Sequence, residues 1–237
     1  MIYGSIPAGG KGSRLQPIGF SKELALIGRK AVIEYLIERM VLAGINNIFI
    51  NTAADKNDLI SYLAKKSRYR DKLIFTVKAR KGLQDGILTP AKFLKPNDVL
   101  YFGLPDTIWF PRNGFSQLRK FPKGKLTLGL FNTPEPEKFD SVVIDDNHRV
   151  KSIAVKSPKP SSSWIWGIGR VHVSAAAKLN ILSAKQKLTK PLFGVSMNAY
   201  AQSFPTYGIC LDKSNYIDIG RKSDYERALD MFRNSLA

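Results

Sequence analysis

The sequence predicts an α/β protein with a Rossmann-like three-layer αβα architecture around a mixed, mainly parallel central sheet. Three observations lead to this prediction. Through the first half of the chain, apolar strand-like runs alternate with helix-spaced patterns, as is typical of a parallel sheet flanked by helices. In the second half, several apolar runs follow one another without long crossover helices, which indicates a small antiparallel portion. The 237 residues, 44% of them hydrophobic, suffice for one substantial core.

The first half alternates strictly. Residues 1–6 predict a buried strand, and the glycine-rich segment that follows predicts a tight turn. Apolar residues then recur at helical spacing from Val32 to Val41, and Ala43 with Gly44 supplies a helix stop. The elements expected after this helix are a strand at 47–51, a helix at 55–65, a strand at 73–77, a helix at 84–94 and a strand at 99–103.

The second half is expected to be mixed and partly antiparallel. The polar turn from Asp145 to His148 predicts a hairpin between two apolar runs. The expected strands are 126–131, 141–144, 150–155, 164–173 and 204–211, and the expected helices are 175–183 and 223–235. We therefore expect a single domain, residues 1–237, made of two halves at about 1–120 and about 121–237.

The charge balance is unusual, because 37 Lys and Arg against 19 Asp and Glu give a net charge of +18. The densest basic run, from Lys65 to Lys81, could bind an anionic partner such as nucleic acid or a membrane surface. However, the lysines are scattered through every element without the aromatic interleaving of nucleic-acid modules, which argues against nucleic acid.

No apolar run approaches the roughly 20 residues that cross a bilayer, and Met1 leads directly into a strand. We therefore expect a soluble, cytoplasmic protein without a membrane span. The only cysteine, Cys210, excludes a disulfide within the chain and offers no zinc or redox motif.

The segment Pro7 to Leu24, PAGGKGSRLQPIGFSKEL, predicts a site for a nucleoside triphosphate. Gly9, Gly10 and Gly12 free the backbone to aim N–H groups at phosphate oxygens, and Arg14 and Lys22 add positive charge. The segment is not a Walker A loop, since GxxxxGK[ST] does not fit it. It is not a dinucleotide fingerprint either, because Leu15 stands where the third glycine would be.

Residues 7–52 resemble the signature of the sugar-phosphate nucleotidyltransferases, such as the glucose-1-phosphate thymidylyltransferases. The family pattern is roughly LAGGxGTRLxPLT, PKxLLPI and KPxIxYxIExLxxAGI. Here AGGKGSRLQP, SKELALIGRKAVIEYLIERMVLAGI and NNIFINT follow it in order and spacing. The resemblance implies transfer of a nucleoside monophosphate from a nucleoside triphosphate to a sugar 1-phosphate, with the nucleotide bound by the first half and the sugar phosphate by the second.

The resemblance also implies two ligands for Mg²⁺. Asp106 in VLYFGLPDTIWF stands in the family's first metal position, although Pro105 replaces the usual glycine, and Asp218 in NYIDIGRKSDYERAL stands in the second. Their positions are reasonable on physical grounds, because ligands of open α/β sheets collect at the carboxyl ends of strands and magnesium prefers oxygen donors. The two histidines are isolated, which argues against zinc.

The remaining expected site residues follow the family motifs. Lys156 in VKSIAVKSPKP matches the lysine that contacts the sugar phosphate, and it joins Arg14 and Lys22 as a catalytic residue. Gly167 is expected beside Lys156 in the sugar-phosphate site. The expected nucleotide-binding residues are Ala8, Gly9, Gly10, Gly12, Ser13, Gly82 and Asp106.

Departures from the pattern leave alternatives open. Lys78 replaces the glutamine that reads the base in many relatives, and Val155 replaces the glutamate of the EKP motif. Base and acceptor are therefore undetermined, and a cytidylyltransferase acting on a small phosphomonoester such as phosphocholine remains an alternative. A non-catalytic sensor of nucleotides or sugar nucleotides and a basic nucleic-acid-binding protein are two more. Assembly into a homo-oligomer is possible.

Overall fold

The computed structural model describes residues 1–10, 19–79, 81–121, 124–187, 191–211, 215–220 and 222–234, the last four without their side chains. Gly12, Ser13 and Arg14 lie outside this part of the chain. In the described residues, a nine-stranded sheet forms the centre of the molecule.

Four strands of the first half form the parallel part of the sheet. β1 pairs in parallel with β4 on one side and with β6 on the other, and β5 pairs in parallel with β4 at the edge. Their bounds are Ile2–Pro7 (β1), Ile48–Thr52 (β4), Leu73–Val77 (β5) and Val99–Gly103 (β6). Each agrees with the expected strand to within a residue or two, and their parallel pairing confirms the predicted alternation with helices.

The second half extends the same sheet through the long strand β11 (Trp164–His172), which lies antiparallel to β6, β8 and β9. β12 pairs in parallel with β8, and β10 forms an antiparallel hairpin with β9. The other bounds are Leu126–Asn132 (β8), Asp140–Ile144 (β9), Val150–Val155 (β10) and Thr206–Cys210 (β12). Following these pairings, all strands but β10 and β11 run in one direction, so the sheet is mixed and mainly parallel.

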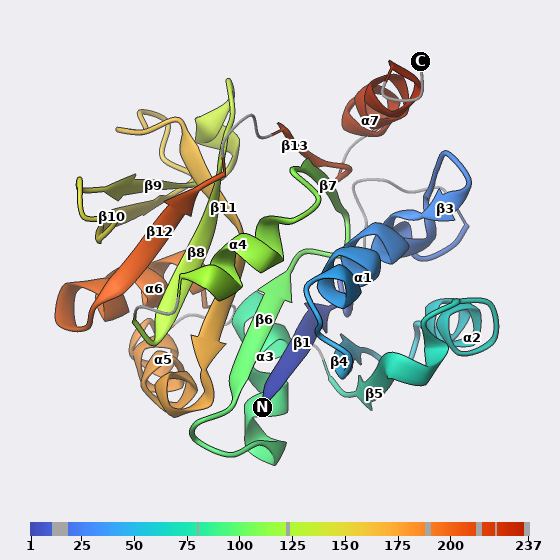
Figure 1. Ribbon diagram of the computed structural model, residues 1–237, viewed down its shortest axis with the longest axis horizontal. Helices are drawn as coiled ribbons and strands as arrows, with labels where there is room; N and C mark the ends of the chain where they lie inside the picture. Colours follow the sequence, from blue (N-terminus) through green and yellow to red (C-terminus); the bar gives the residue numbers. More distant parts are fainter. Residues whose placement is uncertain are drawn as a thin grey trace.

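Helices cover both faces of the sheet, which confirms the three-layer architecture (Figure 1). One face packs against α1 (Val32–Leu42), α2 (Asn57–Lys65) and α4 (Gly114–Lys120). The other packs against α3 (Leu83–Leu88), α5 (Val173–Lys185) and α6 (Phe193–Ser203). Side chains alternate between the two cores along β6, since Tyr101 belongs to the first and Phe102 to the second.

Three differences from the expected elements have physical reasons. The helix expected at 84–94 splits into α3 and a 3₁₀ helix at Thr89–Phe93 (η3), because Pro90 has no N–H to continue the α-helical ladder. Helices α4 and α6 were not expected. α4 is short and begins at a glycine, whereas α6 is sandwiched between α5 and β10 and has no charged face to give a helical period.

A separate two-stranded ribbon was also not expected. β7 (Thr107–Phe110) pairs antiparallel with β13 (Asn215–Asp218), and Thr107 lies opposite Asp218. The ribbon lies beyond the carboxyl ends of β1 and β6, next to the C-terminal helix α7 (Lys222–Asn234) in Figure 1. The ribbon thus joins a segment of the first half of the sequence to one of the second half, near the carboxyl ends of the parallel strands.

No helix in the described ranges is long and apolar enough to pass through a bilayer. The division into two halves stays a prediction.

Candidate active site

A cavity of about 590 Å³ opens where three parallel strands end. Its walls include the last residue of β1, the last two residues of β4 and the residues that directly follow β6. This is the edge of an open α/β sheet at which ligands bind. Of the expected site residues that the structure describes, the cavity brings together Gly9, Gly10, Lys22, Gly82, Asp106, Lys156 and Asp218.

One side of the cavity, which we name the parallel-strand wall, is formed by Gly9, Gly10, Lys22, Gly82 and Asp106. Just before it, the Ala8 N–H donates to the Asn51 carbonyl at 2.8 Å, which ties the loop after β1 to β4. Ala8 itself is fully buried and does not line the cavity. Gly10 lies beside Lys22, whose Cε would be 3.8 Å from a Cβ added at Gly10. The loop thus presents backbone next to a fixed cation.

Gly82 occupies a backbone conformation that requires glycine. Its φ of 109° lies in a region that L side chains rarely adopt, and it stands at the N-terminal end of α3. Gly82 and Gly86 both line the cavity, and the Gly86 N–H donates to the Gly82 carbonyl. This turn therefore exposes main chain to the cavity at the start of α3.

Lys78 also lines the cavity, but its ammonium already has partners within the protein. It forms an ion pair with the Asp85 carboxylate and donates to the Thr89 hydroxyl and, at 3.4 Å, to the Asp85 carbonyl. A lysine ammonium has three donors, so these contacts use all of them. Gln84 turns away from the cavity and donates to the Leu179 carbonyl of α5 at 2.8 Å. Both side chains brace α3.

Lys22 and Asp106 form a largely buried ion pair in the cavity. Lys22 stands on a 3₁₀ turn at Lys22–Leu24 (η1), while Asp106 precedes β7. Burial lowers the pKa of the Lys22 ammonium, but the negative charges of Asp106, Glu23 and Asp218 outweigh that effect and hold the pKa above its usual value. Lys22 is thus a permanent cation at neutral pH.

The β7–β13 ribbon brings the two aspartates from opposite ends of the sequence together. Asp218 lies opposite Thr107, the residue after Asp106, and the Ile219 N–H donates to the Asp106 carbonyl at 2.9 Å. Both carboxylates line the cavity, and both act on the Lys22 ammonium. The unexpected ribbon is therefore what assembles this pair.

Two carboxylates in one cavity fit Mg²⁺, because this ion commonly binds through one or two carboxylates and completes its shell with water and substrate phosphate. Within the described residues, no group of three or more His, Cys, Asp or Glu side chains is arranged to hold a metal. The donor set of Asp106 and Asp218 is thus all oxygen.

The opposite side of the cavity, which we name the antiparallel wall, is formed by Lys138, Phe139, Asp140, Lys156 and Trp166. Lys156 has a φ of 44°, a left-handed conformation that costs a side-chain-bearing residue of order 1 kcal/mol. Its N–H donates to the Phe139 carbonyl at 3.0 Å. Such strain is found at sites where a side chain must be aimed, and here it places Lys156 on the cavity wall at the end of β10.

Asp140 lies behind Lys156 on this wall. The Trp166 indole N–H donates to its carboxylate at 3.3 Å. Burial raises the pKa of Asp140, against the opposing effects of this hydrogen bond and of the Lys156 charge. The wall therefore carries two cations, Lys138 and Lys156, and one buried anion, Asp140.

Gly167 does not line the cavity. It sits at a bulge in β11, between Trp166 and Ile168, and a Cβ at this position would lie 2.3 Å from Tyr216 and 2.8 Å from Phe131. The glycine is needed for aromatic packing behind the site, and it acts on the cavity only through Tyr216, which lines it.

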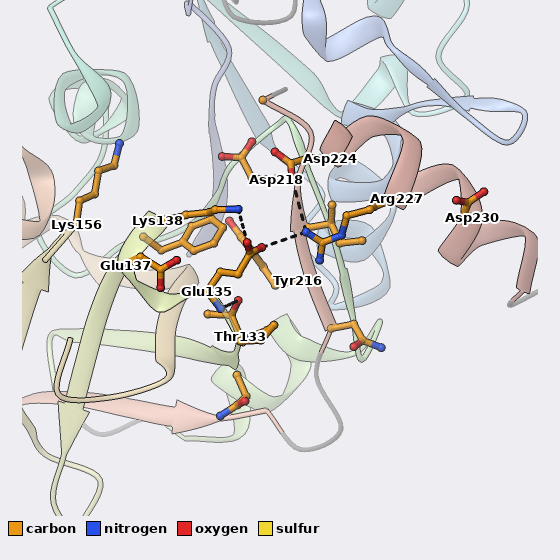
Figure 2. A pocket seen from close by; sticks show the side chains of 16 residues that line it. Thr133, Glu135, Glu137, Lys138, Lys156, Tyr216, Asp218, Asp224, Arg227 and Asp230 are labelled. Atoms are coloured by element: carbon orange, nitrogen blue, oxygen red, sulfur yellow. Dashed lines mark hydrogen bonds and ion pairs between the residues drawn. The ribbon is translucent and has the colours of Figure 1, made fainter. Parts of the chain in front are cut away.

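A side chamber of about 680 Å³ adjoins the cavity and shares five residues with it: Lys138, Phe139, Lys156, Tyr216 and Asp218. Figure 2 shows this chamber between the 3₁₀ turn Pro136–Lys138 (η4), β13 and α7. Glu135 pairs with Lys138 and, at 3.1 Å, with Arg227 of α7, and Arg227 also approaches Asp224. These pairs link α7 to the antiparallel wall.

Sequence reasoning missed Glu23, Lys138 and Tyr216 as cavity residues. Tyr216 could have been found, because it precedes Asp218 by two positions and alternate residues of a strand share a face. Lys138 lies in a short turn that has no recognisable sequence pattern. Glu23 is next to Lys22, and only Lys22 was considered as a site residue in this turn.

The family model described as nucleotidyl transferase matches residues 4–234. A glucose-1-phosphate thymidylyltransferase of Neisseria gonorrhoeae is 32% identical over 170 residues, which cover 69% of this chain and 58% of that protein. One from Streptomyces griseus is 26% identical over 65% of this chain and 44% of that protein. The chain thus spans about half the length of these curated relatives.

Solved structures support the fold. A putative glucose-1-phosphate thymidylyltransferase from Bacillus anthracis, crystallised with sucrose, has a TM-score of 0.86 at 23% identity and covers 99% of this chain and 96% of its own. HddC from Yersinia pseudotuberculosis has a TM-score of 0.76 at 19% identity, covering 98% and 99%. At such identities the likeness is one of architecture.

Proposed function

The chain belongs to the nucleotidyl transferase family, and from that membership we propose that it transfers a nucleoside monophosphate from a nucleoside triphosphate to a sugar 1-phosphate. The products are a nucleoside diphosphate sugar and pyrophosphate. One observation carries the proposal: a single cavity holds Gly9 and Gly10 of the glycine-rich segment, lysines on both walls and two carboxylates brought together by a ribbon. A site for two phosphate-bearing substrates needs this combination.

The reaction takes place at the α phosphorus. An oxygen of the acceptor phosphate forms a bond to it, and the bond from this phosphorus to the oxygen that bridges the α and β phosphates breaks as pyrophosphate leaves. A phosphate monoester is already anionic at neutral pH, so the attacking oxygen needs no strong base. The main obstacle is repulsion between two polyanions, and positioning together with fixed positive charge reduces it.

The chain's own residues divide this work between the two walls. Gly9, Gly10 and Gly82 present backbone to the nucleotide, and their lack of side chains allows its close approach. Lys156 holds the acceptor phosphate from the antiparallel wall, with Asp140 and Trp166 behind it. Lys22, on the parallel-strand wall, attracts the attacking phosphate and is oriented by Asp106.

Asp106 and Asp218 would hold Mg²⁺, which when bound supplies positive charge to the phosphate oxygens. The Lys22 ammonium pairs with Asp106 at the same place, so the cation and the proposed ion site lie side by side.

The other assignments stay predictions. Gly12, Ser13 and Arg14 were expected to contact the triphosphate, and Arg14 to hold its β and γ phosphates. Ala8 is fully buried and supports the loop from behind. Gly167 does not line the cavity in which a sugar would bind. A cytoplasmic location and a homo-oligomer also stay predictions.

The test is a matrix of nucleoside triphosphates against sugar 1-phosphates and small phosphomonoesters, with magnesium, measured by pyrophosphate release. We expect release that requires both substrates and is strongest for one pair. Strongest release with cytidine triphosphate and phosphocholine would replace the sugar acceptor by a phosphomonoester. Tight nucleotide binding by calorimetry without release in any pair would favour a sensor and contradict the proposal.

A further inference from the structure

The turn that carries Lys22 is only three residues long, and it is held on both sides by the start of α2. Before Lys22, the Ser21 N–H and hydroxyl donate to Asp58 at 2.6 and 2.7 Å. After Lys22, the Glu23 carboxylate accepts from the Lys56 ammonium at 2.7 Å. The position of Lys22 in the cavity thus depends on two contacts with one helix start.

The Glu23–Lys56 pair differs from an ordinary surface ion pair, because both side chains are almost fully buried. Glu23 also lines the reaction cavity. Only its Oε2 is paired with Lys56, and Oε1 receives no hydrogen bond from any protein group in the described ranges. A buried carboxylate that loses its counter-charge is strongly destabilised and will attract the nearest other cation.

That other cation is Lys22. Two charged groups act on Glu23: Lys56, the residue just before α2, and Lys22, which stands on the same turn as Glu23. Lys22 is in turn attracted by Asp106 and, more weakly, by Glu23. The two carboxylates therefore compete for one ammonium, and Lys56 decides the competition by neutralising Glu23.

We propose that Lys56 is a positioning residue of the transfer reaction: by pairing with Glu23, it leaves the Lys22 ammonium on Asp106 and free to receive the acceptor phosphate. The catalytic consequence rests on the proposed function. The geometric consequence, that Lys22 turns toward Glu23 when Lys56 is removed, does not.

The kinetic test compares Lys56→Met with Glu23→Gln/Lys56→Met. The single variant leaves a buried carboxylate that diverts Lys22, so we expect kcat to fall about 10- to 100-fold, with the KM for the nucleoside triphosphate within about twofold of wild type. The double variant has no carboxylate to divert Lys22, so kcat should recover at least about tenfold relative to Lys56→Met. Lys56→Arg, which keeps the charge, should retain most activity.

The control is Lys65→Met, the same substitution at an exposed lysine in the last turn of the same helix. It should not change kcat. Should Lys56→Met fail to fold, Lys56→Gln keeps a hydrogen-bond donor for Glu23 without the charge, and the same loss is expected. A double variant as inactive as the single one would overturn the proposal, since it has no Glu23 carboxylate to divert Lys22.

Crystal structures of wild type and Lys56→Met separate the two proposals. We expect the Lys22 ammonium on Asp106 in wild type and within 4 Å of Glu23 in the variant, the distance of an ion pair. Lys22 remaining on Asp106 in the variant would overturn the positioning role. An inactive wild-type protein whose variant shows the shift would contradict the transferase proposal alone.

Discussion

The two walls of the reaction cavity carry their charges in different ways. On the parallel-strand wall, Lys22 pairs with Asp106 inside the cavity, and Lys56 and Glu23 are only 6% and 1% exposed. Beside the antiparallel wall, Arg227 and Glu135 are 54% and 36% exposed, and Lys138 is also near the surface. Buried pairs fix a site before its ligand arrives, whereas exposed pairs contribute little and exchange readily with water.

Under the proposed function, the triphosphate meets the buried pairs of the first wall and the acceptor meets the second wall. The second wall is made of a hairpin, a short turn and the α7 contact. Substitutions on each wall test this division.

Substituting either aspartate that the β7–β13 ribbon brings together should have the largest effect, because both carboxylates line the cavity. Asp106→Asn and Asp218→Asn should each lower kcat at least about 100-fold, since each keeps the shape but loses the charge. Pyrophosphate release measures this, and Asp146→Asn in the exposed β9–β10 turn is the control. Near wild-type turnover in Asp106→Asn would remove the site assignment.

Substituting Lys156 should affect only the acceptor. We expect Lys156→Ala to raise the KM for the acceptor about tenfold or more, since a charged hydrogen bond to phosphate is lost, with the KM for the nucleoside triphosphate nearly unchanged. Initial rates at varied concentrations of each substrate distinguish these effects. The control, Lys151→Ala, replaces an exposed lysine of β10, the strand that ends just before Lys156. Equal effects on both substrates would show that the walls do not act separately.

Removing the carboxylate of Asp58 should affect stability in a pH-dependent way. Burial raises the pKa of Asp58, but hydrogen bonds from Ser21 and Leu59 and the charge of Lys56 outweigh it and leave the pKa below its usual value. A depressed pKa stabilises the folded state above the unfolded pKa near 4, and this contribution is lost as pH falls through the lower folded value. Asp58→Asn should therefore lose up to about 1 kcal/mol at pH 7, because the group is partly exposed.

Urea unfolding of wild type and Asp58→Asn at pH 7 and at pH 3 measures this contribution. The difference between the two proteins should shrink at pH 3. A difference that grows as the pH falls would mean that the Ser21 contacts do not depend on the ionised carboxylate.

The smallest effect is expected for the exposed pair that joins α7 to the antiparallel wall. Glu135→Gln should change the free energy of unfolding by less than about 1 kcal/mol, since exposed ion pairs of this kind contribute little. Chemical denaturation at low and high salt checks it, with Glu226→Gln on the exposed side of α7 as the control. A loss above about 2 kcal/mol would contradict the contrast drawn between the walls.

Local patterns predicted much of the fold and of the parallel-strand wall. The strands of the first half carry buried apolar runs bounded by polar turns, and Gly9, Gly10 and Lys22 are close in sequence. Lys156 and the two aspartates were identified only through family motifs, but the cavity brings all of them together. What they share is a position at or just beyond the end of a strand.

The remaining features depend on distant contacts that no local pattern contains. Nothing in residues 107–110 indicates that they pair with 215–218, since β propensity does not specify a partner. Likewise, the packing of α3 against its neighbours decides two further contacts. It places three acceptors around Lys78, and it buries Gln84 against α5. Gly167 lies outside the cavity lining because a bulge in β11 turns it toward Tyr216 and Phe131, and bulges leave little trace in hydrophobic alternation.

The β7–β13 ribbon also sets when the site can first exist during synthesis. Its two strands are separated by about 110 residues, and contacts of such long sequence separation form late in folding. A chain still emerging from the ribosome has its glycine loop, Lys22 and Asp106 long before Asp218 is available. The growing chain therefore contains Lys22 and Asp106 early, but it acquires the second carboxylate only when β13 docks.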